Sequence, residues 1–238
     1  MGISAFIQAL TGFGFAIVSV AALTQVPWIA HSSVFNAVQP VAATLGALTG
    51  WILILPEFKR VDWKAVSVLL AASTMTTPVG AVMLEYFNPE VVIRGLGALI
   101  SGFVLYSALG VPVPKKLGSV PGAWGLGFLA GALGGAFDIT GPPLVVHGEA
   151  AGWETSNGDF RRNVLAVVTI NSSLVVLWDF FAGRLNDYYY MDFVRWAAPT
   201  TLVGIALGKL LADRLDPSAF KKIVLGTCMV MGVKLLFT

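Results

Sequence analysis

The stretch Gly134-Gly135-Ala136-Phe137-Asp138-Ile139-Thr140-Gly141-Pro142-Pro143 lies inside an apolar run that covers residues 121–152. A second glycine-rich stretch, Thr11-Gly12-Phe13-Gly14, divides the apolar run at residues 2–25 in a similar way. Proline ends or kinks a helix, and glycine is the residue found where backbones bend or approach closely. The two stretches therefore predict two broken helices, one near the start of each half of the chain.

The composition surrounding these breaks is that of a membrane protein. Of the 238 residues, 56% are hydrophobic and 12% are charged, and the mean hydropathy is +0.79. A soluble domain carries about a quarter of its residues as charged ones. Apolar runs of about 20 residues recur along the chain, the length that crosses a ~30 Å hydrocarbon core. We expect an all-α polytopic membrane protein of one structural domain, with the lipid bilayer as its surroundings. The scattered Lys and Arg predict no nucleic-acid partner.

The apolar segments divide into two similar halves, which indicates an internal repeat. Matching positions occur in the same order and at nearly constant spacing: Thr11-Gly12 with Thr140-Gly141, Asn36 with Asn163, Trp51 with Trp178, Asp62 with Asp192, and Gly80 with Gly208. We predict repeat 1 over residues 1–110, a linker over 111–120 and repeat 2 over 121–238. Repeat 1 holds the broken segment 2–25 and helices 33–56, 65–87 and 91–111; repeat 2 holds the broken segment 121–152 and helices 163–182, 193–212 and 218–238.

Positive charge selects between two topologies for these segments. If every segment crosses the bilayer, Lys and Arg divide almost evenly between the two faces, and the positive-inside rule gives no orientation. If the two broken segments re-enter, all but four of the 15 Lys and Arg lie on one face. The four exceptions are Arg94, Arg184, Arg195 and Lys234. We therefore predict two inverted repeats, each with a Gly-rich re-entrant helix and three spanning helices, and both termini outside the cytoplasm.

The two breaks are the candidate binding site. Non-helical backbone at membrane depth survives only inside protein or beside a water-filled cavity, and N-termini of half-helices offer free N–H groups to anions. Thr140 suits an N-cap, Gly141 allows close approach of a ligand, and a following proline suits the first helical turn. The candidate substrate-binding residues are Thr11, Gly12, Phe13, Gly14, Asn36, Thr140, Gly141, Pro142, Pro143 and Asn163. Phe13 is a candidate wall or gate of this site.

Each of these assignments has a structural alternative. Glycine and proline also serve as kinks for helix packing, and Asn36 and Asn163 are equally suited to hydrogen bonds between helices. Asp138 is the candidate proton-coupling group, because ionisable residues at membrane depth are costly and usually functional. Its alternative is a neutral or solvated carboxyl that caps the break. Asp179 is expected at the membrane interface. No catalytic grouping and no metal-ligand spacing stands out, so we predict neither a metal nor a cofactor.

Around the breaks the chain resembles the TauE/SafE group of sulfite and organosulfur exporters. Ala9-Leu10-Thr11-Gly12-Phe13-Gly14-Phe15-Ala16 is similar to the first family motif. The second motif resembles Gly134-Gly135-Ala136-Phe137 followed by Thr140-Gly141-Pro142-Pro143-Leu144-Val145-Val146. Val61-Asp62-Trp63-Lys64 and Met191-Asp192-Phe193 look like the short segment before the third helix of each copy. Asp138 departs from the family pattern, in which small or hydroxyl residues are usual at that position.

The resemblance covers nearly the whole chain and implies movement of sulfite, a sulfonate or a related anion, often linked to the proton gradient. We expect a secondary transporter, in the export direction, that works by alternating access around a midplane site between the breaks. It would lie in a bacterial cell inner membrane as a multi-pass protein, with protons as candidate coupling ions and a homo-oligomer as a candidate assembly. The alternatives are an anion channel, an uptake permease for small carboxylates, a membrane-embedded enzyme and a non-transport assembly factor. We expect no enzymatic activity.

Overall fold

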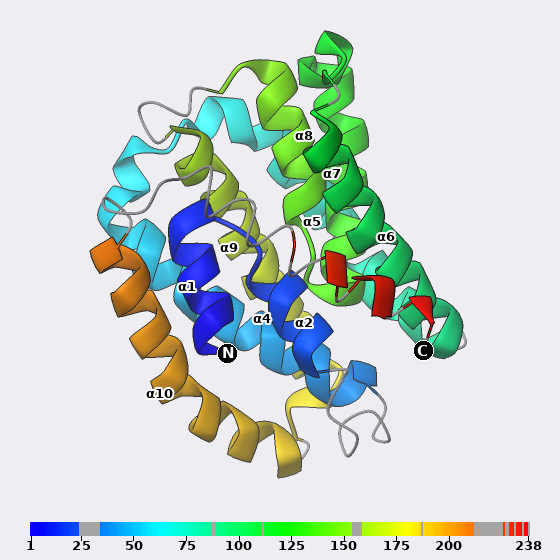
Figure 1. Ribbon diagram of the computed structural model, residues 1–238, viewed down its shortest axis with the longest axis vertical. Coiled ribbons are helices and arrows are strands. Elements are labelled where there is room, and N and C mark those ends of the chain that lie inside the picture. Colours follow the sequence, from blue (N-terminus) through cyan, green and yellow to red (C-terminus); the bar gives the residue numbers. More distant parts are fainter. Residues whose placement is uncertain are drawn as a thin grey trace.

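The chain folds into a bundle of helices (Figure 1). This computed structural model describes residues 1–23, 34–86, 89–110, 112–153, 159–186 and 188–211, with residues 226, 229–230, 232–234 and 236–237. The longer helices are α1 (Gly2–Thr11), α2 (Phe15–Leu23), α4 (Val34–Ile54), α5 (Trp63–Tyr86), α6 (Pro89–Leu109), α7 (Val120–Phe137), α8 (Gly141–Ala151), α9 (Asp159–Phe181) and α10 (Tyr188–Leu211). Three short 3-10 helices are η1 (Leu55–Arg60), η2 (Lys115–Gly118) and η3 (Arg184–Asn186). Most of the helix predicted at residues 218–238 lies outside the described residues.

The all-α class predicted from composition is confirmed for the part of the chain that the structure describes. Within it, four segments are long and apolar enough to cross a membrane: Val38–Arg60, Trp63–Met83, Val120–Phe137 and Asp159–Phe181. Large apolar side chains are exposed on the outer surface of the bundle, among them Phe181, Trp196 and Leu210. In water such a surface would be unfavourable, and in lipid it is the expected one.

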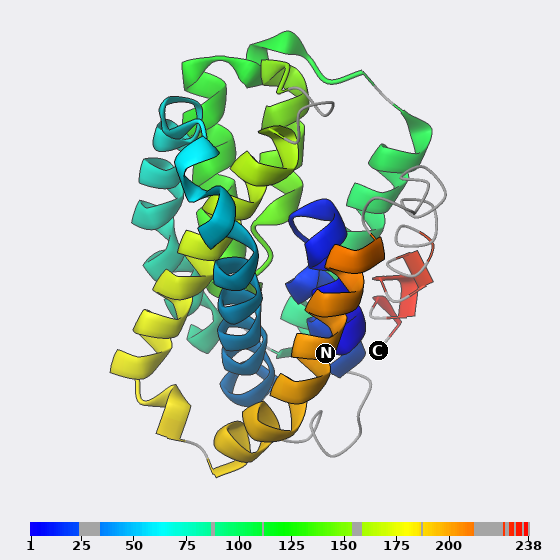
Figure 2. The ribbon, with the colours of Figure 1, turned by 90° about the vertical axis from the view of Figure 1, so that its left-hand side faces the viewer.

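Each broken segment folds as a helical hairpin. A Cβ atom at Gly118, just before α7, would lie 2.4 Å from the backbone of Ala150 near the end of α8. The ring Nδ1 of His147 in α8 lies 2.8 Å from the Leu117 carbonyl oxygen. The end of α8 is therefore beside the start of α7. The α1–α2 hairpin opens toward the opposite end of the molecule, so the tips of the two hairpins lie at mid-height (Figures 1 and 2).

Each hairpin is held by close packing of its first helix on a long helix. α7 packs on α5, and a Cβ atom at Gly80 of α5 would lie 2.1 Å from the Ala132 carbonyl oxygen. α1 packs on α10, and a Cβ atom at Gly208 of α10 would lie 2.5 Å from the Cβ of Ala9. Small residues let helices in a membrane approach closely. Gly80 and Gly208, which match in the sequence, thus serve the same purpose.

α4 and α9 run side by side through the centre and bring their middles to the hairpin tips. The Trp51 indole donates a hydrogen bond to the hydroxyl of Ser173 at 3.0 Å. Gly50 of α4, which has no side chain, packs directly against Thr169 of α9. Gly46 and Ser172, each about one helical turn from the Gly50–Thr169 contact, face the tips. This packing fixes the depth at which the two breaks meet.

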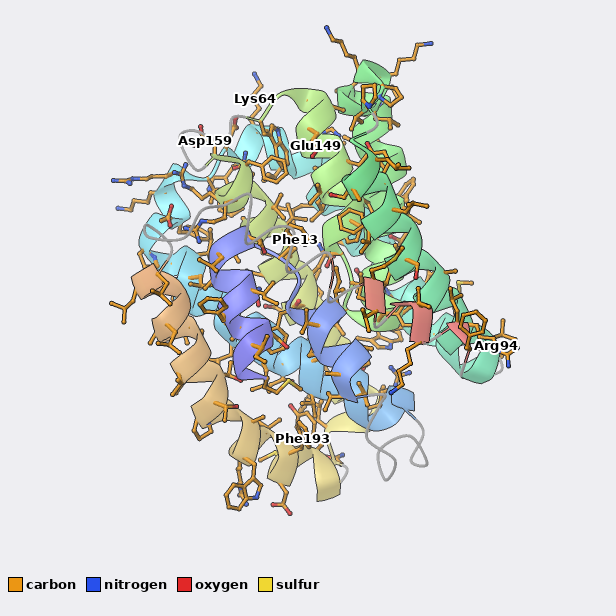
Figure 3. All side chains as sticks on the ribbon, viewed as in Figure 1. Phe13, Lys64, Arg94, Glu149, Asp159 and Phe193 are labelled. Atoms are coloured by element: carbon orange, nitrogen blue, oxygen red, sulfur yellow. The ribbon has the colours of Figure 1, made fainter. Side chains whose placement is uncertain are left out.

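Charged residues gather at the two ends of the bundle. Lys64 and Asp159 lie at one end and Arg94 at the other (Figure 3). Near the Lys64 end, Glu57 pairs with Arg161 at 2.7 Å and also with the next arginine of α9.

Asp179, which was expected at the membrane interface, lies near the end of α9 and is buried within the protein. Its side chain is 0% exposed and pairs with Arg184 at 3.0 Å, and the same guanidinium donates to the Ala81 carbonyl oxygen at 3.3 Å. A buried carboxylate needs such a partner, because an isolated buried charge is very costly. The pair ties the end of α9 and the following turn to α5.

Candidate functional site

The two breaks have the same backbone construction. α1 ends at Gly12, which has φ 85° and donates its N–H to the Gln8 carbonyl oxygen at 2.8 Å. α7 ends at Asp138, which has φ 59° and donates its N–H to the Gly134 carbonyl oxygen at 2.7 Å. Each left-handed residue is followed by two residues and then by a new helix. Gly12 thus corresponds to Asp138, so the predicted match of Thr11-Gly12 with Thr140-Gly141 is wrong by three residues.

The tips of the two hairpins enclose a small buried cavity together with the centres of α4 and α9. Its free volume is about 10 Å³, close to the space for one water molecule. The lining residues are Gln8, Phe13, Gly14, Phe15, Ala16, Ile17, Gly46, Asp138, Ile139, Thr140, Gly141, Val168 and Ser172. An oxyanion is larger than water, so the walls must move apart before one can bind. The cavity in this structure is closed.

The first turn of α2 supplies backbone donors to this cavity. Phe15, Ala16 and Ile17 all line it, and the first N–H groups of any helix have no partner within the helix. The preceding residue, Gly14, has φ 94° and no side chain that could cap these groups. The N-terminus of α2 therefore directs the positive end of its helix dipole toward the cavity, and the structure shows no side chain among the described residues capping its N–H groups.

The first turn of α8 contributes a hydroxyl group instead. Thr140 occupies the N-cap position, yet its side chain makes no capping hydrogen bond. A capping side chain accepts from the N–H of the second or third helical residue. Those residues are Pro142 and Pro143, which have no N–H. The Thr140 side chain is 1% exposed, and its hydroxyl has no partner among the described residues.

Asp138 forms the acidic wall of the cavity. Its side chain is 4% exposed, and the Ser172 hydroxyl donates to Oδ1 at 2.7 Å. A Cβ atom at Gly46 would lie 3.2 Å from Oδ2, so the glycine lets α4 approach the carboxyl closely. Gln8 completes this polar wall: its Oε1 has no hydrogen-bond partner among the described residues, although its side chain is fully buried.

The structure brings five of the predicted residues to the cavity and places five elsewhere. Phe13, Gly14, Asp138, Thr140 and Gly141 line it.

Thr11, Gly12 and Asn163 have structural contacts away from the cavity. The Thr11 hydroxyl donates to the Ile7 carbonyl oxygen at 2.9 Å, and Gly12 packs on the Arg161 carbonyl oxygen. Asn163 accepts from the Asp62 N–H at 3.0 Å, which fixes the start of α5. Pro142 and Pro143 are buried in α8 and do not line the cavity. Asn36 belongs to α4, but its side chain lies outside the described part of the chain.

Phe15, Ala16 and Ile17, which directly follow the first break, line the cavity and were not predicted. Gln8, Gly46 and Ser172 are further site residues that sequence reasoning missed. Each stands in a regular apolar helix, without glycine or proline neighbours that would mark a break. One signal was present for Gln8, since it is a long amide in an apolar run one turn before the first break. Ser172 carries no such signal, because serine is common in membrane helices as a packing residue.

The cavity offers both hydrogen-bond donors and hydrogen-bond acceptors. No group of three or more His, Cys, Asp or Glu side chains that could hold a metal ion occurs among the described residues. The donors toward the cavity are the α2 N–H groups and the Thr140 hydroxyl, while Asp138 and Gln8 add acceptors. Acceptor groups suit a proton or a protonated ligand, and N–H groups suit an anion.

Fold and cavity together define an all-α protein with segments long and apolar enough to span a membrane and with a buried polar site between two helical hairpins. The chain matches the protein family described as "Sulfite exporter TauE/SafE" over residues 1–235, and it belongs to that family of membrane transporters. The resemblance that the break motifs indicate is thereby confirmed. A relative from Cupriavidus necator (strain H16), described as "Probable sulfite/organosulfonate exporter TauE", is 24% identical over 99% of this chain and 91% of its own length. No solved structure matches the chain.

Proposed function

We propose that this protein is a secondary transporter that exports a small sulfur oxyanion, such as sulfite or a sulfonate, through the cavity between the two breaks. The observation that carries the proposal is the Thr140 hydroxyl. It is buried, unpartnered within the described residues and beside the uncapped first turn of α2. Buried polar groups are nearly always hydrogen-bonded, so an orphaned donor at an anion-attracting helix end is best explained by a ligand.

Asp138 gives the proposed site a link to protons. An ionised carboxylate on the wall would repel an anion, so the two are compatible only when Asp138 carries a proton. The Ser172 hydroxyl can rotate and either donate to the carboxylate or accept from the carboxylic acid. Asp138 then binds a proton whenever the cavity binds an anion, and the two move together.

The direction of transport follows from the charge that moves. A divalent sulfite ion together with one proton carries a net charge of −1. A membrane potential that is negative inside drives that charge outward, by about 2.3 kcal/mol for each 100 mV. At equal pH and equal sulfite concentration on both sides this pair would therefore be exported, in agreement with the printed name of the C. necator relative. A monovalent sulfonate with one proton is neutral, so its own concentration gradient would drive its export.

The proposed mechanism is alternating access by two inverted repeats around this cavity, and the arrangement of the hairpins supports it. The α1–α2 and α7–α8 hairpins open toward opposite ends, and each packs by its first helix on a corresponding long helix, α10 or α5. Two halves of opposite orientation can rock against each other around a central site, which then faces either side in turn. The end that carries Lys64 would face the cytoplasm by the positive-inside rule.

The test is flux of radiolabelled sulfite from proteoliposomes that contain the purified protein. We expect saturable efflux that an inside-negative potential accelerates, and that Gly141→Leu abolishes because the new side chain would fill the cavity beside Phe13. Gly95→Leu is the matched control, since nothing lies within 4 Å of a Cβ atom there.

Other outcomes of the same assay assign the other functions. Flux that does not saturate would identify a channel, and flux of small carboxylates alone would replace the substrate class. Absence of flux for every anion, from protein shown to be folded, would contradict transport and leave an assembly role.

A further inference from the structure

A second and larger cavity lies between α6 and α8, outside the site described above. Its volume is about 280 Å³. The lining residues are Phe103, Tyr106, Ser107, Gly110, Pro112, Val113, Val145 and Glu149. Phe103, Tyr106 and Ser107 follow the spacing of one face of α6. Gly110, Pro112 and Val113 belong to the segment that leads from α6 to η2. The cavity therefore lies toward the end of the molecule that carries the linker.

One face of α8 runs from the central cavity into this second cavity. Gly141 lines the central cavity, and Val145 and Glu149 line the larger one. Residues four apart in a helix lie on the same face, one turn above another. A ligand that moves along this face of α8 passes from one cavity to the other within about two helical turns, roughly 12 Å.

An aromatic pair stands between the two cavities on that line. The Phe13 ring lines the central cavity and meets the ring of Phe103, which lines the larger one, edge to face with centroids 6.4 Å apart. Phe13 also packs against Gly141, where a Cβ atom would lie 2.6 Å from the ring. Figure 3 shows Phe13 near the middle of the molecule, at the tip of the first hairpin.

The larger cavity has a polar group without a partner. The Tyr106 hydroxyl is shielded from solvent and has no hydrogen-bond partner among the described residues. Glu149 lies at the rim, where its exposed carboxylate is screened by water and salt. η2 packs on α8 at the same end and carries the exposed Lys115 and Lys116. Their positive charge at this end of the molecule favours the approach of an anion.

We propose that the cavity between α6 and α8 is the vestibule through which the anion reaches the central site, and that Phe13 and Phe103 form its gate. The anion enters from the end that carries the linker and meets the Tyr106 hydroxyl. It passes the rings only when Phe13 swings off Gly141. The inference rests on the proposed function for the identity of the ligand, but the path and the gate stand on the geometry alone.

The experiment measures which positions a charged reagent can reach. The sequence has one cysteine, Cys228, which is first replaced by serine. Single cysteines are then placed at Ser107, in the vestibule, and at Ala16, in the central cavity. Inside-out and right-side-out membrane vesicles are treated with an anionic, membrane-impermeant methanethiosulfonate, which resembles a sulfonate ligand.

We expect Ser107→Cys to react from one side of the membrane only, whether or not the gate is intact. Ala16→Cys should react at least about tenfold more slowly behind the intact gate, and Phe13→Ala should remove most of this difference. Phe103→Ala opens the gate from the other helix and should have the same effect, so the result does not depend on one variant. Phe128→Ala, an exposed ring on α7, is the matched control and should leave the labelling unchanged.

Equal labelling of Ala16→Cys with and without both rings would overturn the gate. Protection of Ser107→Cys from both sides would overturn the vestibule. Labelling needs no transport, so failure of the flux assay with this labelling pattern would remove the anion-transport proposal and leave the path. Flux without this labelling pattern would support the anion-transport proposal and overturn the path and the gate.

Discussion

At the scale of single residues, Thr140 occupies a helix N-cap position but makes no capping hydrogen bond. It stands where a threonine normally caps a helix, and the two prolines that follow leave it nothing to cap. Its hydroxyl is free to bind a ligand, and α8 loses two N–H donors at its first turn. The backbone donors of the site consequently come from α2, where sequence reasoning had assigned them equally to both hairpins.

Thr140→Val tests that hydroxyl. The substitution keeps the shape of the side chain and removes one hydrogen bond to a charged ligand, worth about 1.5–3 kcal/mol. We expect the KM for anion flux to rise by roughly 10- to 100-fold, with thermal stability nearly unchanged. Thr201→Val is the matched control, because that buried hydroxyl bonds the Ala197 carbonyl oxygen on α10, away from the cavity. An unchanged KM for Thr140→Val would remove the hydroxyl from the site.

Asp138→Asn tests the coupling to protons. Wild-type flux should fall as pH rises, because loss of the proton leaves a carboxylate that repels the anion. Asparagine cannot ionise and also tolerates the left-handed backbone at this position, so the variant should transport with a flat pH profile. Flux is measured with equal pH on both sides, beside Asp192→Asn, an exposed carboxyl near Arg195. A profile that still follows the wild type would place the titrating group elsewhere.

Sequence reasoning located the breaks but not all of their contents. Glycine and proline in an apolar run are strong local signals, and they led to Phe13, Gly14 and Gly141. The register between the copies was lost because a Thr-Gly pair occurs in both, while the position that needs a left-handed residue is filled by Gly12 in one and by Asp138 in the other. Gln8 and Ser172 reach the cavity only through the packing of regular helices, which the sequence does not reveal.

At the scale of elements, the first turn of α2 has the anion-binding role in the proposed mechanism. Ala16→Pro removes one of its N–H groups, and proline is tolerated in the first turn of a helix. We expect the dissociation constant of the anion to rise about tenfold, the loss of one hydrogen bond. Ile3→Pro is the matched control, since it occupies the equivalent second position of α1 and is exposed. Equal anion affinity in the two variants, measured by titration calorimetry, would contradict this role.

The glycines between α5 and α7 hold the second hairpin in place. Alanine normally stabilises a helix relative to glycine by about 1 kcal/mol. At Gly80 the added Cβ would overlap the Ala132 carbonyl oxygen, so Gly80→Ala should destabilise by about 1–3 kcal/mol. Gly95→Ala, with open space around it, should leave stability unchanged or raise it. Thermal unfolding in detergent compares the two, and equal melting temperatures would contradict the close packing.

Helix bounds followed from the sequence where glycine, proline or charge marks the end of an element. The predicted helix at 193–212 begins at Tyr188 in the structure, because the tyrosines and Asp192 before it read as a polar interruption. The broken segments divide at residues 12–14 and 138–140, within the marked stretches. The ion pair between Asp179 and Arg184 was not predicted, because Arg184 lies in the short helix η3 and periodicity does not predict contacts between elements.

At the scale of the whole molecule, two oppositely directed hairpins meet at one closed cavity, and a vestibule approaches it from one end. In the proposed mechanism, α2 and Thr140 bind the anion and Asp138 binds the proton. The rings of Phe13 and Phe103 control access to the cavity. Ion pairs lie beyond the cavity on either side, between Glu57 and Arg161 and between Asp179 and Arg184. In the proposed mechanism, they brace the helices that move when the halves rock.

The measurement that tests the central claim most directly is a structure determined with selenite, a pyramidal analogue of sulfite whose selenium gives an anomalous signal. The account predicts one peak between the first turn of α2 and α8, with oxygen atoms within about 3 Å of the Thr140 hydroxyl and the Ala16 N–H. The cavity would be wider than in the present structure, and Thr140→Val should weaken the peak. A peak at another place, or none at saturating selenite, would contradict an anion site at the breaks.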